Sequence, residues 1–177
     1  MPVTSHHGLH TTDVNAESAP PVRPLERRDR EPLRILLEDT GMFPREEVDI
    51  ALELIDIVLD RPGQTDYLIR CYDAGDGAAG YYCIGPTPAT EGTFDLYWIA
   101  VRRGEQGRGI GGMLNAHAEA LAQSLGGRLL IAETSSQPRY EPTRTFYVRH
   151  GYAETARIPH YYRPGDDLVV YAKYLIQ

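Results

Sequence analysis

The chain has 177 residues, of which 42% are hydrophobic and 24% are charged, as in an ordinary globular domain that needs no disulfide or metal to fold. Asp and Glu outnumber Lys and Arg by 25 to 18, and the net charge of -7 argues against nucleic acid as a partner. The sequence contains neither an apolar run of membrane-spanning length nor a signal-peptide stretch, so we expect a cytoplasmic protein without membrane contact.

Residues 1–20 are polar and end in prolines, which is typical of a disordered leader, and we expect one domain over residues 21–177. Three histidines of this leader could bind a metal, but a solvated tail is the favoured interpretation: His6, His7 and His10. Cys71 and Cys83 lie in apolar, strand-like segments without a CxxC or a nearby histidine. We therefore expect buried thiols and predict no metal site.

The N-terminal third predicts one short strand and two helices. The strand is expected over 22–25, and an apolar stripe of leucines indicates a helix over 27–39, which Gly41 ends. The second helix, over 45–60, begins after Pro44 with acidic residues in its first turn, where they suit the helix dipole.

The middle of the chain predicts three strands, a helix and a fourth strand. Short, turn-rich loops join the strands at 66–72, 80–84 and 93–101, which favours an antiparallel meander. Apolar residues then recur at helical spacing from Ile110 until the two glycines at 126 and 127. The continuous apolar run over 128–134 is expected to be a strand covered on both faces.

A short helix over 142–150 and two strands, at 152–157 and 168–175, are expected to complete the chain, with a loop over 158–167 between the strands. The element order is β-α-α-β-β-β-α-β-α-β-β. The predicted class is therefore α/β, a mixed sheet with helices on both faces.

A glycine-rich loop lies between the strand ending at Val101 and the helix that begins near Gly109. Glycines let a ligand approach the backbone, and the free N–H groups of a first helical turn bind pyrophosphate. Gly107, Gly109 and Gly112 also satisfy the dinucleotide-binding pattern G-x-G-x-x-G. That alternative requires the first glycine directly after the strand and a doubly wound sheet, whereas five residues intervene here and only about 65 residues follow the motif.

Gln106, Gly109 and Gly111 form the pattern Q-x-x-G-x-G, which resembles the acyl-CoA signature of the Gcn5-related N-acetyltransferases, the GNAT family. The segment FYVRHGY at Phe146–Tyr152 resembles that family's F-Y-x-K-x-G-F segment, and the resemblance covers about 22–177. The chain departs from the family at Tyr140, where many relatives have Asn.

The resemblance implies a mostly antiparallel sheet that is splayed between its fourth and fifth strands, with a bulge in the strand ending at Val101. Backbone groups of Ile99, Ala100 and Val101 would pair with the pantetheine arm of acetyl-CoA. The loop and first helical turn would bind the pyrophosphate through Gln106, Gly107, Arg108, Gly109, Ile110, Gly111 and Gly112. Relatives commonly pair, so a homodimer is compatible with the resemblance.

An amine must lose a proton before it attacks a thioester, which calls for a base. Glu133, at the end of an apolar strand beside the implied cleft, is the first candidate, although it could instead cap the following turn. Asp95 is the second candidate, on the face of Ile99 and Val101 if its strand alternates regularly. Tyr147 resembles the family's general acid, which protonates the CoA thiolate, and packing in the core is its structural alternative.

The segment 158–167 contributes His160, Tyr161, Tyr162, Asp166 and Asp167, which suit a small polar amine, and a plain surface loop is the alternative. Arg139 and Arg144 could meet an acceptor carboxylate, although surface charge is the favoured interpretation. These features predict direct acetyl transfer from acetyl-CoA to a primary amine of a small molecule. A protein amine is an alternative acceptor, and a non-catalytic acyl-CoA-binding module is the alternative function.

Overall fold

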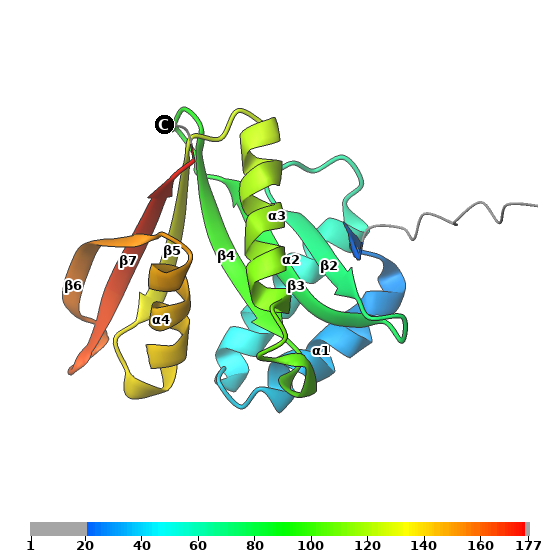
Figure 1. Cartoon of the computed structure of the whole chain (residues 1–177), viewed down its shortest axis with the longest axis horizontal. Helices are drawn as coiled ribbons and strands as arrows, with labels where there is room; N and C mark the ends of the chain where they lie inside the picture. The colour runs from blue at the N-terminus through cyan, green and yellow to red at the C-terminus, as the bar shows by residue number, and fades with distance from the viewer. Residues whose placement is uncertain (1–20, 176–177) are drawn as a thin grey trace, which may run out of the picture.

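The computed structural model describes residues 21–175. Its seven strands form one mixed sheet in the order β1-β2-β3-β4-β5-β7-β6 (Figure 1). Within these residues β4 and β5 form the one parallel pair, and the other neighbours are antiparallel. The strands are β1 Val22–Pro24, β2 Leu68–Asp73, β3 Ala78–Pro86, β4 Thr93–Val101, β5 Leu129–Ser135, β6 Ala153–Arg163 and β7 Asp166–Tyr174.

Helices cover both faces of the sheet: α1 (Arg30–Asp39) and α2 (Arg45–Asp60) lie on one face, and α3 (Ile110–Ser124) and α4 (Glu141–Arg149) on the other (Figure 1). Each long helix buries an apolar stripe, as its periodicity predicts. Short 3₁₀ turns η1, η2 and η3 occupy Arg27–Asp29, Arg103–Glu105 and Pro138–Tyr140. None of the helices in the described residues has the length and apolarity needed to span a bilayer.

The predicted element order and the mixed α/β class are confirmed. The free, buried state expected for Cys71 and Cys83 also agrees with the structure, where burial raises the pKa of both thiols to about 12. The proposed leader with its three histidines lies outside the described residues, and a single domain over 21–177 stays a prediction.

The prediction of a loop over 158–167 is wrong. Strand β6 continues to Arg163, and Pro164 and Gly165 alone separate it from β7. Gly165 has φ 83°, a value that a tight turn between strands often requires and glycine adopts without strain. Pairing is irregular between Ile158 and Arg163, so these tyrosine-containing residues extend the hairpin without regular register.

Strand β5 is not covered equally on both faces, contrary to expectation. Leu130, Ala132 and Thr134 are buried, whereas Glu133 on the other face is exposed. The reason is that β4 pairs with β5 only from Thr93 to Asp95, so the remainder of β5 borders an opening in the sheet.

The expected splay between β4 and β5 is confirmed, and so is the expected bulge. Cys83 and Ile84 of β3 pair with Trp98 and Leu96, which leaves Tyr97 as the extra residue of β4. A bulge bends its strand and increases its twist. Strand β4 therefore follows β3 for its whole length while it diverges from β5.

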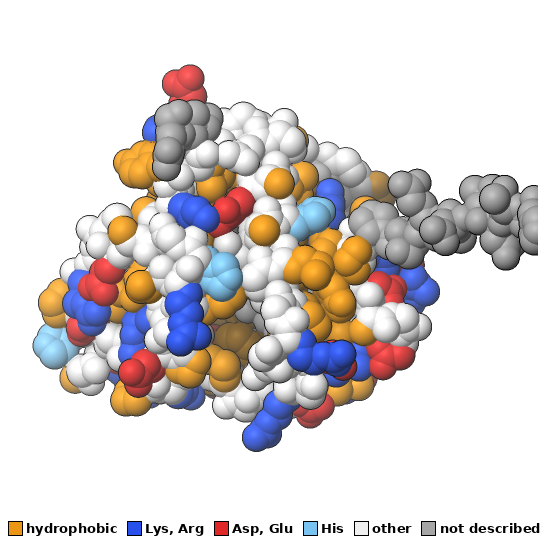
Figure 2. Space-filling view, viewed as in Figure 1, with side chains coloured by type: hydrophobic (Ala, Val, Ile, Leu, Met, Phe, Trp, Pro, Cys, Tyr) orange, Lys and Arg blue, Asp and Glu red, His pale blue; other side chains and the backbone are white. Residues whose placement is uncertain are grey.

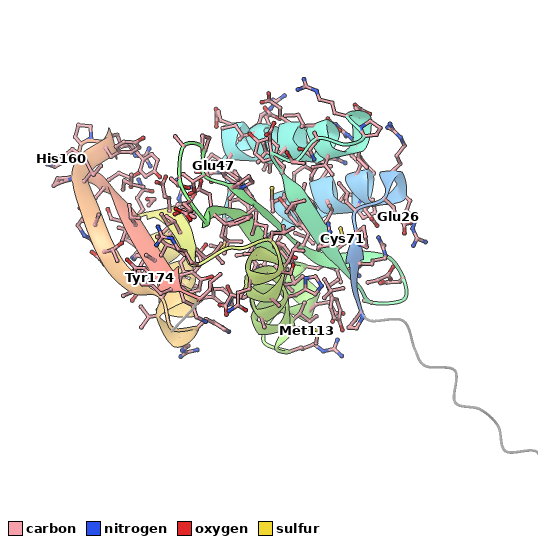
Figure 3. The ribbon with its side chains drawn as sticks, turned by 90° about the horizontal axis from the view of Figure 1, so that it is seen from above. Glu26, Glu47, Cys71, Met113, His160 and Tyr174 are labelled. Carbon is pink, nitrogen blue, oxygen red and sulfur yellow. The ribbon has the colours of Figure 1, made fainter. Side chains whose placement is uncertain are left out.

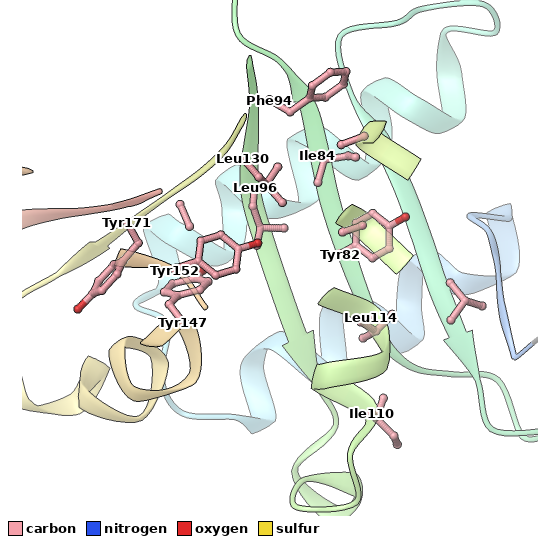
Figure 4. Packing of buried hydrophobic residues seen from close by; sticks show 14 of the residues in the cluster. Tyr82, Ile84, Phe94, Leu96, Ile110, Leu114, Leu130, Tyr147, Tyr152 and Tyr171 are labelled. Atoms are coloured by element: carbon pink, nitrogen blue, oxygen red, sulfur yellow. The ribbon is translucent and has the colours of Figure 1, made fainter. Parts of the chain in front are cut away.

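A buried polar network joins the two halves of the molecule across this opening. The Tyr152 hydroxyl donates to Oδ1 of Asn115 on α3 at 3.0 Å, and the Asn115 amide donates to Glu119 at 2.6 Å. Glu119 forms an ion pair with Lys173 of β7 at 2.7 Å, and Lys173 also donates to the His150 carbonyl after α4. Figure 4 shows Tyr152 beside Tyr147, next to α4. The network thus ties α3 to α4 and β7 where no strand pairing does so.

Tyr152→Phe should lower the free energy of unfolding by about 1–3 kcal/mol, because it leaves the buried Asn115 carbonyl oxygen without its donor. Urea unfolding followed by circular dichroism measures the change. Tyr174→Phe is the matched control, since Tyr174 is 68% exposed. Equal stability of the two variants would show that the network does not hold the halves together.

Candidate active site

The opening between β4 and β5 forms a cleft of about 510 Å³. The hollow between α3 and α4 is visible in Figure 2, with hydrophobic side chains at its floor. The cleft is lined by Phe43, Pro44, Glu46, Glu47, Tyr97, Trp98, Ile99, Glu133, Thr134, Ser135, Arg139, Tyr140, Thr143, Tyr147, Tyr162, Arg163 and Asp166. A second hollow, of about 540 Å³, lies on the outer side of α2, is more open to solvent and shares no residue with the cleft.

The glycine-rich loop leads directly into the first turn of α3. Gly107 and Gly109 have φ values of 77° and 83°, in the left-handed region that favours glycine, and Gly109 is the N-cap of the helix. The Gln106 side-chain amide donates to the Val101 carbonyl at 3.1 Å, which holds the loop against the end of β4. The first N–H groups of α3 have no partner within the helix and can donate hydrogen bonds to an anion.

Two glycines of the first turn let α4 approach α3 closely. A Cβ atom on Gly111 would lie 3.2 Å from the Phe146 ring, and one on Gly112 would lie 2.9 Å from Nε2 of His150. Ile110 is buried in the core, so its backbone alone is available to a ligand. Arg108 forms an ion pair with Glu105 on the surface.

The edge of β4 that faces the cleft has no strand partner beyond Asp95 among residues 21–175. Ile99, Ala100 and Val101 pair on their other edge with Tyr82, Tyr81 and Gly80 of β3. The backbone groups of the open edge need a partner, which an extended ligand could supply by adding to the sheet.

Tyr147 is 4% exposed and contributes to the wall of the cleft. Its ring packs against Tyr152 and Tyr171, with centroid distances of 5.4 and 5.5 Å. Burial raises the pKa of its hydroxyl well above the usual value, so the group keeps its proton throughout the neutral range. The structure thus shows Tyr147 packed in the aromatic core at the wall of the cleft, and its role as an acid stays a prediction.

Glu133 lines the cleft, whereas Asp95 does not. Partial burial, followed by the negative charge of Asp95, raises the pKa of Glu133 although much of its side chain is exposed. Asp95 accepts a hydrogen bond from Thr87 at 2.7 Å. The bulge at Tyr97 places Asp95 on the α1/α2 face with Trp98, not on the face of Ile99 that regular alternation predicts.

The sequence did not reveal the contact between Glu47 and Tyr140. The Tyr140 hydroxyl donates to both carboxylate oxygens of Glu47, at 2.9 and 3.0 Å, from 93 residues away in the chain. Figure 3 shows Glu47 at the N-terminal end of α2, on the side of the C-terminal strands. Burial raises the pKa of Glu47, and the Tyr140 hydrogen bond partly opposes that rise. The departure from Asn at position 140 was the one sequence signal that could have indicated this contact.

Other predicted side chains have structural partners. Arg144 donates to the carbonyls of Ser135 and Gln137, which places it in the turn after β5. His160 accepts a hydrogen bond from the Gly165 amide. Of the aromatic residues in the hairpin, Tyr162 lines the cleft, and the Tyr161 ring packs edge-on against the Tyr162 ring.

Comparison with known proteins agrees with this geometry. A family model described as "Acetyltransferase (GNAT) domain" matches residues 65–154, about half of the chain. A proposed GNAT acetyltransferase from Desulfovibrio desulfuricans is 42% identical, with a TM-score of 0.85 over 88% of this chain and 98% of that chain. A search of curated proteins found no match.

Two more distant structures show the same fold. An aminoglycoside 6'-N-acetyltransferase complexed with coenzyme A is 17% identical, with a TM-score of 0.70 over 88% of this chain and 97% of that chain. A proposed acetyltransferase from Salmonella typhimurium with its cofactor acetyl-CoA is 16% identical, with a TM-score of 0.68 over 88% and 94%. With its splayed sheet, its glycine-rich helix start and the family match, the chain belongs to the GNAT acetyltransferase family.

Proposed function

We propose that the protein transfers the acetyl group of acetyl-CoA to a primary amine of a small molecule. The observation that carries the proposal is the opening between β4 and β5, with the start of α3 at one end and Tyr147 in its wall. A pantetheine arm that adds to the free edge of β4 brings its thioester toward Tyr147, while the pyrophosphate lies on the first N–H groups of α3.

The residues of the cleft supply a base, an acid and oxyanion donors. Glu133 accepts the proton of the ammonium group, and the resulting amine forms a bond to the thioester carbonyl carbon. N–H groups at the free edge of β4 stabilise the oxyanion. The C–S bond then breaks, and Tyr147 donates its hydroxyl proton to the departing thiolate. The attacking nitrogen gives up its second proton, which restores the Tyr147 hydroxyl through water, and Glu133 releases its proton to solvent. The products are the amide and the CoA thiol.

A non-catalytic acyl-CoA-binding module is the alternative function. It would need the helix start and the β4 edge but no proton donor or acceptor in the cleft. The raised pKa of Glu133 suits a base that works near neutral pH, and the protonated Tyr147 suits an acid. These two groups favour catalysis over binding alone.

Binding of the cofactor tests the loop. In isothermal titration, we expect the protein to bind acetyl-CoA and CoA with micromolar affinity and not to bind NAD. Gly109→Ala should weaken acetyl-CoA binding about 5- to 30-fold, because a side chain in the left-handed region costs about 1–2 kcal/mol and shifts the loop. Gly104→Ala, in the same loop but without positive φ or close neighbours, should bind normally. Preference for NAD would overturn the interpretation of the loop.

Tyr147→Phe should lower kcat by about 100-fold while acetyl-CoA affinity is unchanged, because it removes the proton donor and keeps the packed ring. Thiol release in the presence of an amine library measures turnover. Tyr171→Phe is the matched control, from the same aromatic cluster but outside the cleft lining. Normal turnover by Tyr147→Phe would exclude this residue as the acid.

Glu133→Gln should lower kcat/KM for the amine by about 100-fold at pH 7. Wild-type kcat/KM should fall on acidification, as Glu133 becomes protonated. Because the pKa of Glu133 is raised, the inflection should lie above about 4.3, the usual pKa of Glu. The variant should lack this inflection, and Asp95→Asn should retain it. A pH profile that Glu133→Gln leaves unchanged would point to a water relay instead.

A further inference from the structure

The cleft carries more carboxylates than guanidinium groups. Four acidic side chains and two arginines line it: Glu46, Glu47, Glu133 and Asp166, with Arg139 and Arg163. Asp166 already has three partners, because Ser135 and Gln137 donate hydrogen bonds to it and Arg163 lies 3.5 Å away. Arg139 alone therefore faces the three remaining carboxylates, and the cleft favours a cationic ligand.

Glu47 does not make the capping hydrogen bond that a glutamate in the first turn of a helix often makes. It is the third residue of α2, where a glutamate commonly bonds back to the backbone N–H of the N-cap residue. Here the N-cap is Pro44, which has no N–H to donate. The Glu47 carboxylate instead points to the cleft and receives the Tyr140 hydroxyl.

Tyr140 orients the Glu47 carboxylate and leaves most of its hydrogen-bond acceptor sites open. The tyrosine is 6% exposed, and the Arg139 guanidinium lies 5.2 Å from the centre of its ring. A carboxylate offers about four acceptor sites, and one hydroxyl hydrogen fills only part of them. Because the glutamate side chain is already ordered, a ligand that binds it loses less conformational entropy on binding.

Aromatic side chains complete a surface for a cation with an apolar body. Six of them line the cleft: Phe43, Tyr97, Trp98, Tyr140, Tyr147 and Tyr162. Aromatic faces attract ammonium groups and pack against methylene chains. Burial raises the pKa of Tyr162 to about 12, and the charges of Glu133 and Glu47 add to that rise. Tyr162 and both carboxylates line the same cleft.

We propose that Glu47, held in place by Tyr140, binds a second ammonium group of the acceptor, so that the substrate is a diamine or polyamine. One amino group is anchored at Glu47 while another reaches Glu133 and the thioester. The identification of the ligand as an acceptor rests on the proposed function, whereas the binding of a diamine can be measured without turnover. Tyr140 is a positioning residue in this site.

Equilibrium titration of the CoA-saturated protein with three probes of four carbon atoms each tests the proposal: 1,4-diaminobutane, butylamine and 4-aminobutanoate. The diamine should bind at least about tenfold more tightly than butylamine, since a hydrogen-bonded ion pair adds more than an apolar end, and the amino acid should bind most weakly. Glu47→Gln should reduce diamine affinity to that of butylamine. Equal affinity of the wild type for the three probes, or no diamine binding, would overturn the proposal.

Glu46→Gln is the matched control, because it removes the same charge from the neighbouring residue, which is exposed on α2. It should reduce diamine affinity much less than Glu47→Gln. An equal loss in both variants would mean that the overall charge of the cleft, rather than a site at Glu47, attracts the diamine. Circular dichroism and acetyl-CoA titration show whether each variant is folded.

Tyr140→Phe tests the positioning role through pH. The charged and titratable groups that share the cleft with Glu47 are Glu46 on α2, Arg139 and Tyr140 on η3, Glu133 on β5, Tyr147 on α4, Tyr162 and Arg163 on β6, and Asp166 on β7. The Tyr140 hydrogen bond lowers the pKa of Glu47, so its removal should raise that pKa. Diamine binding needs the ionised carboxylate, and its loss on acidification should therefore begin at higher pH in Tyr140→Phe. An unchanged pH profile would show that Tyr140 does not act on Glu47.

Transfer assays with the same probes separate this proposal from the function itself. Diamine binding at Glu47 without acetylation of any amine would contradict the proposed function and leave the site intact. Acetylation of all three probes at equal kcat/KM would support the function and overturn the site.

Discussion

The early end of pairing between β4 and β5 is the constraint on which the rest of the structure depends. Three residue pairs join the strands, after which the bulge at Tyr97 turns β4 away and leaves one edge of its backbone without a partner. Unpaired backbone groups in the middle of a sheet are costly unless a ligand or water satisfies them. The cleft therefore occupies the place where a strand would lie beside β4. The free N–H and C=O groups of β4 already point into it.

An interrupted sheet needs another connection between its halves. The network of Tyr152, Asn115, Glu119 and Lys173 supplies it on the α3/α4 face, and the Tyr140–Glu47 contact joins η3 to α2 at the cleft. Both connections consist of directional polar contacts, which define a geometry better than apolar packing does. They hold the two walls at a set separation without closing the space between them.

Local patterns predicted most of the fold and the glycine-rich start of α3, because their signals lie within short segments. Helical periodicity located α3, and the glycines that the loop requires are adjacent in sequence. A bulge in β4 was expected but its place was not, and the extra residue at Tyr97 puts Asp95 on the opposite face from the one that regular alternation predicts. The extent of β6 was missed because Pro164 and Gly165 made a two-residue turn inside a segment that reads as a loop. Glu47 and Tyr140 meet only through tertiary folding.

The two ends of the candidate site differ in the same way: one is a single local segment, and the other is assembled by tertiary folding. The loop and the first turn of α3 are one continuous segment, so few substitutions can change its geometry without loss of the helix start. The proposed ammonium site takes Glu47 from α2, Tyr140 from η3 and Glu133 from β5, each on an element with its own packing. A single substitution there can alter the hydrogen-bonding groups of the cleft without disturbing the sheet. Tyr140 in place of the more common Asn is such a change: its longer side chain reaches Glu47, and it converts a position of the cleft wall into support for a carboxylate.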